Sequence, residues 1–272
     1  MQSDGSAKEL LAAGTDAMYE GAFRTGEYDD ADAMLTAALQ RAQADGDRAV
    51  EAGALDQLGW LMHFRVLDRN REGADPEAEE ALFQRSLAIR RELGDQAGTA
   101  ASLFGLALVH QVLRQDPAAA FPYLREALEL ANAHADALLR SECHRHVGFH
   151  YLVADVDLEE AVHHLRRSLE LRHEWGDPRW VPSGTLALGW AELAAGRRAE
   201  GTELIRQSAR EARAPASRSA ACRPLRTGYA APRRARRRSR ADGPRSSRGR
   251  LACGPPDIHC SSPDMNCATR RR

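Results

Sequence analysis

Histidines gather in the middle of this sequence, and they are the first residues whose chemistry has to be considered. His144, His146 and His150 lie close together, beside Cys143. His146 and His150 are four residues apart, so on a helix both imidazoles could reach one metal ion from one face. No HExxH sequence is present, and no carboxylate stands at a fixed ligand spacing. The pattern favours solvated or groove-lining histidines, leaves His146 and His150 as the candidates for a metal site, and predicts no cofactor.

Other catalytic patterns are absent from the sequence. Lys8 is the only lysine and follows an alanine, which excludes a GxxxxGK[ST] phosphate loop. Its place in a polar N-terminal segment argues against a buried Schiff-base lysine. No GxSxG elbow and no cysteine–histidine–asparagine set can be identified. We therefore expect a protein that is not an enzyme.

The elements that carry these residues follow a repeat. Asp47, Asp95, Asp136 and Asp177 stand at intervals of 48, 41 and 41 residues. A fixed period of this length is typical of solenoids, and no segment alternates apolar and polar residues as a strand would. The sequence therefore predicts an all-α fold of about five helical hairpins, at about 7–44, 48–93, 96–133, 136–174 and 178–213.

Small residues recur where the predicted hairpins would pack. Without a bulky side chain, two helices can approach closely. In the second helices, a leucine or isoleucine four residues after each small residue shares the same helix face. The first helices carry Gly59, Ala107, Gly148 and Gly189, and the second helices carry Ala31, Ala120, Ala161 and Gly201.

Two stretches of sequence carry a family resemblance. The segment at 26–31, GEYDDA, resembles the turn between the helices of tetratricopeptide repeats. The segment at 86–103 resembles the long-helix variety of about 41–42 residues, known from kinesin light chains, LGN-type scaffolds and bacterial regulators. The resemblance implies a right-handed α-solenoid that binds another protein. Tyr19 and Glu79 depart from it, since both stand where a small residue is expected, and residues 68–75 form an insertion that predicts a protruding loop or an elongated helix end.

A second series lies one residue beyond the small residues. In tetratricopeptide solenoids this side of the first helix tends to face the concave groove, where large side chains could anchor a peptide or helix. The alternative is that these side chains pack between neighbouring first helices. The series is Trp60, Leu108, Phe149 and Trp190, and its polar neighbours include His63, Gln111 and Arg145.

The charge divides the chain into two parts. Residues 214–272 hold fifteen Arg, seven Pro and three Asp, so they carry +12, and the net charge of −1 leaves −13 for residues 1–213. Such a composition cannot bury a core and predicts a disordered tail. Three interpretations of it remain open: a solvated tail, a segment that contacts nucleic acid through phosphates, and GC-rich coding sequence read out of frame.

These observations predict a non-enzymatic scaffold that binds a peptide or helix of another protein in a concave groove. The alternative is a sensor or oligomerisation module of a bacterial signalling or transcription regulator, with the basic tail as a contact to nucleic acid. No signal segment and no apolar run of membrane-spanning length is visible. We therefore expect a cytoplasmic protein without a membrane partner.

Overall fold

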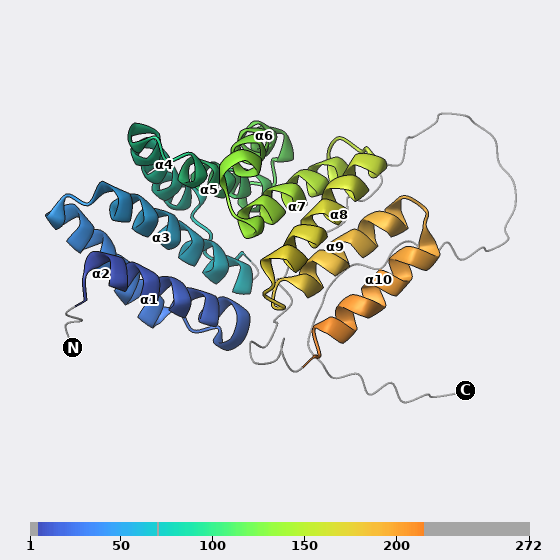
Figure 1. The fold of residues 1–272 in the computed structure, drawn as a ribbon, viewed down its shortest axis with the longest axis horizontal. Helices are drawn as coiled ribbons and strands as arrows, with labels where there is room; N and C mark the ends of the chain where they lie inside the picture. Colours follow the sequence, from blue (N-terminus) through green and yellow to red (C-terminus); the bar gives the residue numbers. More distant parts are fainter. Residues whose placement is uncertain (1–4, 70, 215–272) are drawn as a thin grey trace, which may run out of the picture. The chain divides into compact units, whose positions relative to one another are not determined.

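The computed structural model describes residues 5–69 and 71–214, which form ten α-helices, two π-helical segments and no strand (Figure 1). This confirms the predicted all-α fold. The predicted tail lies outside the described residues, apart from Ala214. The elements are α1 (Ala7–Glu20), η1 (Gly21–Thr25), α2 (Asp29–Asp45), α3 (Arg48–Asp68), α4 (Pro76–Leu93), α5 (Gln96–Leu108), η2 (Val109–Leu113), α6 (Pro117–His134), α7 (Ala137–Val153), α8 (Leu158–Trp175), α9 (Val181–Ala194) and α10 (Arg198–Glu211).

The repeated aspartates mark the starts of three first helices. The side chains of Asp47, Asp95 and Asp136 each accept a hydrogen bond from a backbone amide three residues on, as N-cap residues do. Asp177 differs, because its carboxylate binds Arg179 and α9 begins at Val181 instead of at the expected residue 178. Pro182 explains the shift, since proline is tolerated in the first turn of a helix but breaks a helix interior.

Glycines let the paired helices approach closely. A Cβ atom at Gly148 would lie 2.8 Å from Leu165 Cγ, and one at Gly201 would lie 2.7 Å from the carbonyl oxygen of Gly189. In the first hairpin, Gly14 makes this contact, because a Cβ atom there would lie 2.8 Å from Leu35. The small residue of that hairpin therefore precedes Tyr19 by more than one helical turn.

The extra residues of the second hairpin lengthen helix α3 and form a turn before α4. Helix α3 runs on to Asp68, and a turn with positive φ at Arg71 and Gly73 then leads into α4. The phenol of Tyr28 lies 2.7 Å from Asp68 Oδ2, which ties the end of α3 to the start of α2. Each helix packs against the next one along the chain, as expected for stacked hairpins.

Candidate partner-binding surface

Trp60 packs between three helices and keeps part of its surface exposed. Its ring centroid lies 5.7 Å from that of Phe64 on α3, 6.0 Å from Phe83 on α4 and 5.8 Å from Phe104 on α5. The ring of His63 lies edge-on at 5.8 Å. Trp60 is therefore a rigidly held aromatic side chain at the junction of the second and third hairpins.

The third hairpin contributes a polar contact to the fourth. Gln111, in η2, donates its amide nitrogen to the carbonyl oxygen of His146 at 3.1 Å, and its amide oxygen lies 2.7 Å from His146 Nδ1. Gln111 and the neighbouring Leu108 are both buried. This pair of bonds fixes the imidazole of His146 on the inner side of α7.

Arg145 and Phe149 form a stacked pair on α7. The guanidinium carbon of Arg145 lies 4.6 Å from the Phe149 ring centroid, which is cation–π distance, and Arg145 Nη1 lies 3.3 Å from His146 Nε2. Arg145, His146 and Phe149 are all buried. Burial, followed by the charges of Arg145, His63 and Arg172, lowers the pKa of His146 well below its usual value. A neutral imidazole therefore lies between charged groups here.

The four members of the predicted series differ in how much of their surface is exposed. Leu108 and Phe149 are buried, whereas Trp60 and Trp190 each keep part of their surface in contact with solvent. Ring contacts connect Trp60 to Phe149, because the Phe104 ring lies 5.8 Å from Trp60 and 5.3 Å from His146, and His146 lies 5.6 Å from Phe149. Packing between neighbouring first helices is thus present at Trp60, whereas the ring of Phe149 contacts Arg145 and His146 of its own helix.

The two metal candidates occupy different surroundings. His146 faces Gln111 and Phe104, whereas the ring of His150 stacks on Phe121 with centroids 3.8 Å apart and planes 6° apart. His150 Nε2 lies 3.6 Å from Asp155 Oδ2. Within residues 5–69 and 71–214, no three histidine, cysteine or acidic side chains gather as a metal site would require.

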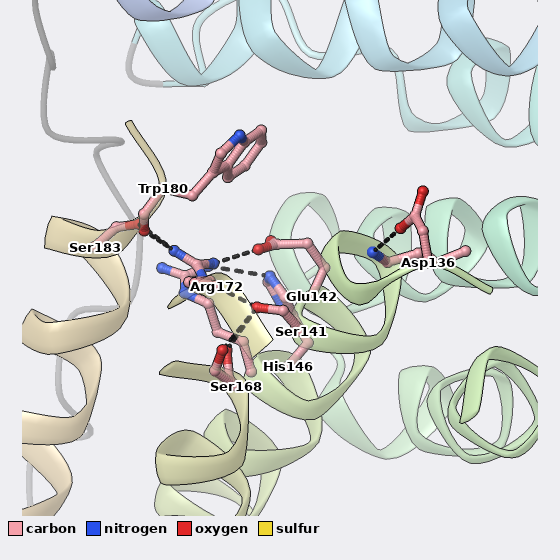
Figure 2. A network of polar contacts seen from close by, with 10 residues as sticks. Asp136, Ser141, Glu142, His146, Ser168, Arg172, Trp180 and Ser183 are labelled. Carbon is pink, nitrogen blue, oxygen red and sulfur yellow. Dashed lines mark hydrogen bonds and ion pairs between the residues drawn. The ribbon is translucent and has the colours of Figure 1, made fainter. Parts of the chain in front are cut away.

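Several residues that shape this region escaped sequence reasoning. Arg172 is fully buried on α8, where it donates to Ser141 Oγ at 3.0 Å and to the Trp180 carbonyl at 2.5 Å and pairs with Glu142 (Figure 2). A signal was available, because Arg172 follows Arg90 by two repeat periods, and Arg90 also reaches a buried acid, Asp56 Oδ2, at 2.6 Å. No comparable signal marked Trp180.

Residues 76–133, which contain α4, α5 and α6, match the family model described as tetratricopeptide repeat. This part of the chain carries tetratricopeptide repeat sequence. The match confirms the resemblance that the segment at 86–103 indicated. No curated protein matches the chain.

Solved structures share the repeat fold. The crystal structure of BtubC (BKLC) from P. vanneervenii has a TM-score of 0.50 and 18% identity, covering 92% of this chain and 100% of that one. A putative kinesin light chain from Podosopora anserina, with nearly identical TPR-like repeats, has a TM-score of 0.50 and 15% identity, covering 77% of this chain and 97% of that one. At these identities the likeness concerns the fold, which is a tetratricopeptide-type solenoid. Among the described residues, no helix is both long and apolar enough to span a membrane.

Proposed function

We propose that this chain is a non-enzymatic scaffold whose first-helix face binds a peptide or helix from another protein. Tetratricopeptide repeats generally support protein–protein interaction, which agrees with this proposal. The observation that carries the finer statement is the partial exposure of Trp60 and Trp190, both on first helices. Tryptophans held rigidly at a surface are frequent centres of binding energy, because they bury a large area and lose little conformational freedom.

The buried members of the series would support these two anchors. Leu108 and Phe149 fill the space beneath the surface, and His63, Gln111 and Arg145 have partners inside the chain. A partner would touch Trp60 and Trp190 first, because both keep part of their surface exposed, whereas Arg145 and Phe149 are buried.

The regulator alternative depends on residues 214–272, almost all of which lie outside the described residues. None of the contacts described above favours it over a scaffold. Salt-dependent DNA binding that disappears when residues 214–272 are deleted would support that alternative.

The test measures binding by matched tryptophan variants. A partner is first identified by cross-linking in the source cell, and the affinity of its purified binding segment is then measured by calorimetry. We expect Trp60→Ala and Trp190→Ala to weaken binding by at least about tenfold, as loss of a hot spot does. Trp175→Ala is the control, because Trp175 lies at the end of a second helix and is 43% exposed. Unchanged affinity in Trp190→Ala and Trp60→Ala, with unchanged melting temperature, would overturn the proposed surface.

A further inference from the structure

Phe23 and Trp180 make a contact that the repeat pattern does not require. Their ring centroids lie 4.8 Å apart at 81°, and Tyr19 also meets Trp180 edge-on at 6.0 Å and 80°. Phe23 belongs to the first hairpin, whereas Trp180 lies between the fourth and fifth hairpins. In a stack of repeats each unit normally contacts only its neighbours. This contact therefore joins the first hairpin to the segment between the fourth and fifth hairpins, which packing between adjacent hairpins does not bring together.

Trp180 is held firmly from its own side. Its carbonyl oxygen accepts hydrogen bonds from Arg172 at 2.5 Å and from Ser183 Oγ at 3.1 Å. The guanidinium carbon of Arg172 lies 5.8 Å from the Trp180 ring. Figure 2 shows Arg172 bonded to Ser141 and Glu142 of α7 and to the Trp180 carbonyl. The indole ring itself packs with Phe23 and Tyr19 of the first hairpin. The late start of α9 is what leaves this residue in the connecting turn.

The first hairpin presents Phe23 from a π-helical segment. Segment η1, Gly21–Thr25, closes with Gly26 in the left-handed conformation at φ 76°. The guanidinium carbon of Arg179 lies 5.6 Å from the Phe23 ring, and Arg179 Nε is bound to Asp177 Oδ2 at 2.7 Å. The position of Phe23 is thus set by η1, and the position of Arg179 beside it is set by the bond to Asp177.

The contact itself is small. Phe23 and Trp180 form its buried centre, and Tyr19 and Leu138 pack against them. Among the described elements, neither helix of the first hairpin packs along α7, α8 or α9. Adjacent hairpins, in contrast, pack along whole helices. The Phe23–Trp180 contact thus joins the first hairpin to the segment before α9 without packing along a whole helix.

Aromatic rings connect this contact to the proposed binding surface. Tyr19 lies 6.2 Å from Phe64, and Phe64 lies 5.7 Å from Trp60. Burial, and then the nearby carboxylates of Glu142 and Asp136 on α7 and at its start, raise the pKa of Tyr19 to about 12, although part of its surface stays exposed. Separation of Phe23 from Trp180 would let water and a partner reach this series of rings.

We infer that Phe23 and Trp180 form a latch that closes the first hairpin onto the segment before α9. In the closed latch Trp180 packs edge-on against Tyr19, which contacts Phe64 beside Trp60, and opening would extend the surface available to a partner from Trp60 to Phe64 and Tyr19. The closure follows from the contacts alone. Its effect on a partner rests on the proposed function.

The latch is tested on the full chain by pulsed electron paramagnetic resonance. Spin labels are attached to cysteines that replace the exposed residues Glu27 and His173. The four cysteines beyond residue 214 are first changed to serine. We expect one narrow distance in the wild type. Phe23→Ala and Trp180→Ala should shift most of the population to a distribution that is broader and several ångströms longer, whereas Trp175→Ala should leave it unchanged.

Exposure of the aromatic rings beside the latch is measured by acrylamide quenching of tryptophan fluorescence. The substitutions Trp175→Phe and Trp190→Phe leave Trp60 and the latch residue Trp180 as the emitting tryptophans. Adding Phe23→Ala should raise their quenching constant, and adding Phe23→Leu should raise it less.

Two results would overturn the latch. One is an unchanged distance in Phe23→Ala with unchanged cooperative melting, because the contact would then hold nothing together. The other is loss of helical circular dichroism in both Phe23→Ala and Phe23→Leu, because the contact would then be part of the folding core. Neither measurement needs a partner, so a failed latch leaves the Trp60 and Trp190 binding test unaffected, and the reverse also holds.

Discussion

The imidazole Nδ1 of His63 lies 2.8 Å from Oε1 of Glu79, and only 2% of His63 and 1% of Glu79 remain exposed. Glu79 stands where the third and fourth hairpins have Ala120 and Ala161. The second hairpin thus replaces an apolar helix contact with a buried polar pair. A buried polar group costs free energy unless it is partnered, so each of these residues depends on the other.

Glu79→Ala should lower the free energy of unfolding by about 3 kcal/mol, because it leaves the buried His63 without its partner. The double variant His63→Leu with Glu79→Ala should recover much of this loss, since the fourth hairpin has Leu152 and Ala161 at the matching positions. Urea denaturation followed by circular dichroism measures both. A double variant no more stable than Glu79→Ala would show that the two residues act independently.

Arg172→Met should destabilise the chain by roughly 3 kcal/mol, because it leaves Glu142 and the Trp180 carbonyl without their buried donor. Thermal unfolding measures the effect. Arg167→Met on the same helix is the matched control, since Arg167 is only partly buried and pairs only with Glu170 among the ion pairs of the described residues. Equal melting temperatures for the two variants would contradict the structural role assigned to Arg172.

Gly201→Ala should destabilise the fifth hairpin by about 1–3 kcal/mol, as overpacking does. The added Cβ would lie 2.7 Å from the backbone oxygen of Gly189, which cannot move aside without shifting α9. Gly53→Ala is the control, because its Cβ would meet only a methyl group of Leu11, at 2.9 Å. A smaller loss for Gly201→Ala than for Gly53→Ala would refute the close-packing argument.

Acid should destabilise the fold through His144. Burial, and then the charge of His164, lower the pKa of His144 from 6.5 to about 4. The unfolded chain therefore binds a proton at this site before the folded chain does, so stability falls as the pH drops from about 6.5 to about 4. Asp56 acts in the opposite direction, since burial raises its pKa from 3.8 to about 6.

The His144→Phe variant isolates this contribution, because Asp56 is unchanged in it. Urea midpoints measured between pH 7 and pH 4 should fall less steeply with acid in His144→Phe than in the wild type. His134→Phe serves as the control, since His134 is exposed at the end of α6. Parallel pH profiles for wild type and His144→Phe would disprove the assignment.

The sequence predicted the repeat fold well because its signals are local. Aspartate caps such as Asp95, and small residues such as Gly148 and Gly201, act within one hairpin or between adjacent helices. The start of α9 was misplaced by three residues because Pro182 outweighs the repeated aspartate. The partner-binding series stays a prediction, since its period fits both groove anchors and packing side chains.

The sequence by itself determined the helical period, the close contacts between paired helices and the absence of recognisable catalytic motifs. Each of these follows from side-chain spacing along a helix, which neighbouring residues settle. Only the tertiary structure decided that Phe23 meets Trp180, that Arg172 is buried and that His63 pairs with Glu79. The Phe23–Trp180 contact depends on how small rotations accumulate over several hairpins, which no period in the sequence records. The contacts of His63 and Arg172 lie within or between adjacent hairpins, but the period gives only the spacing of side chains and not which polar groups pair.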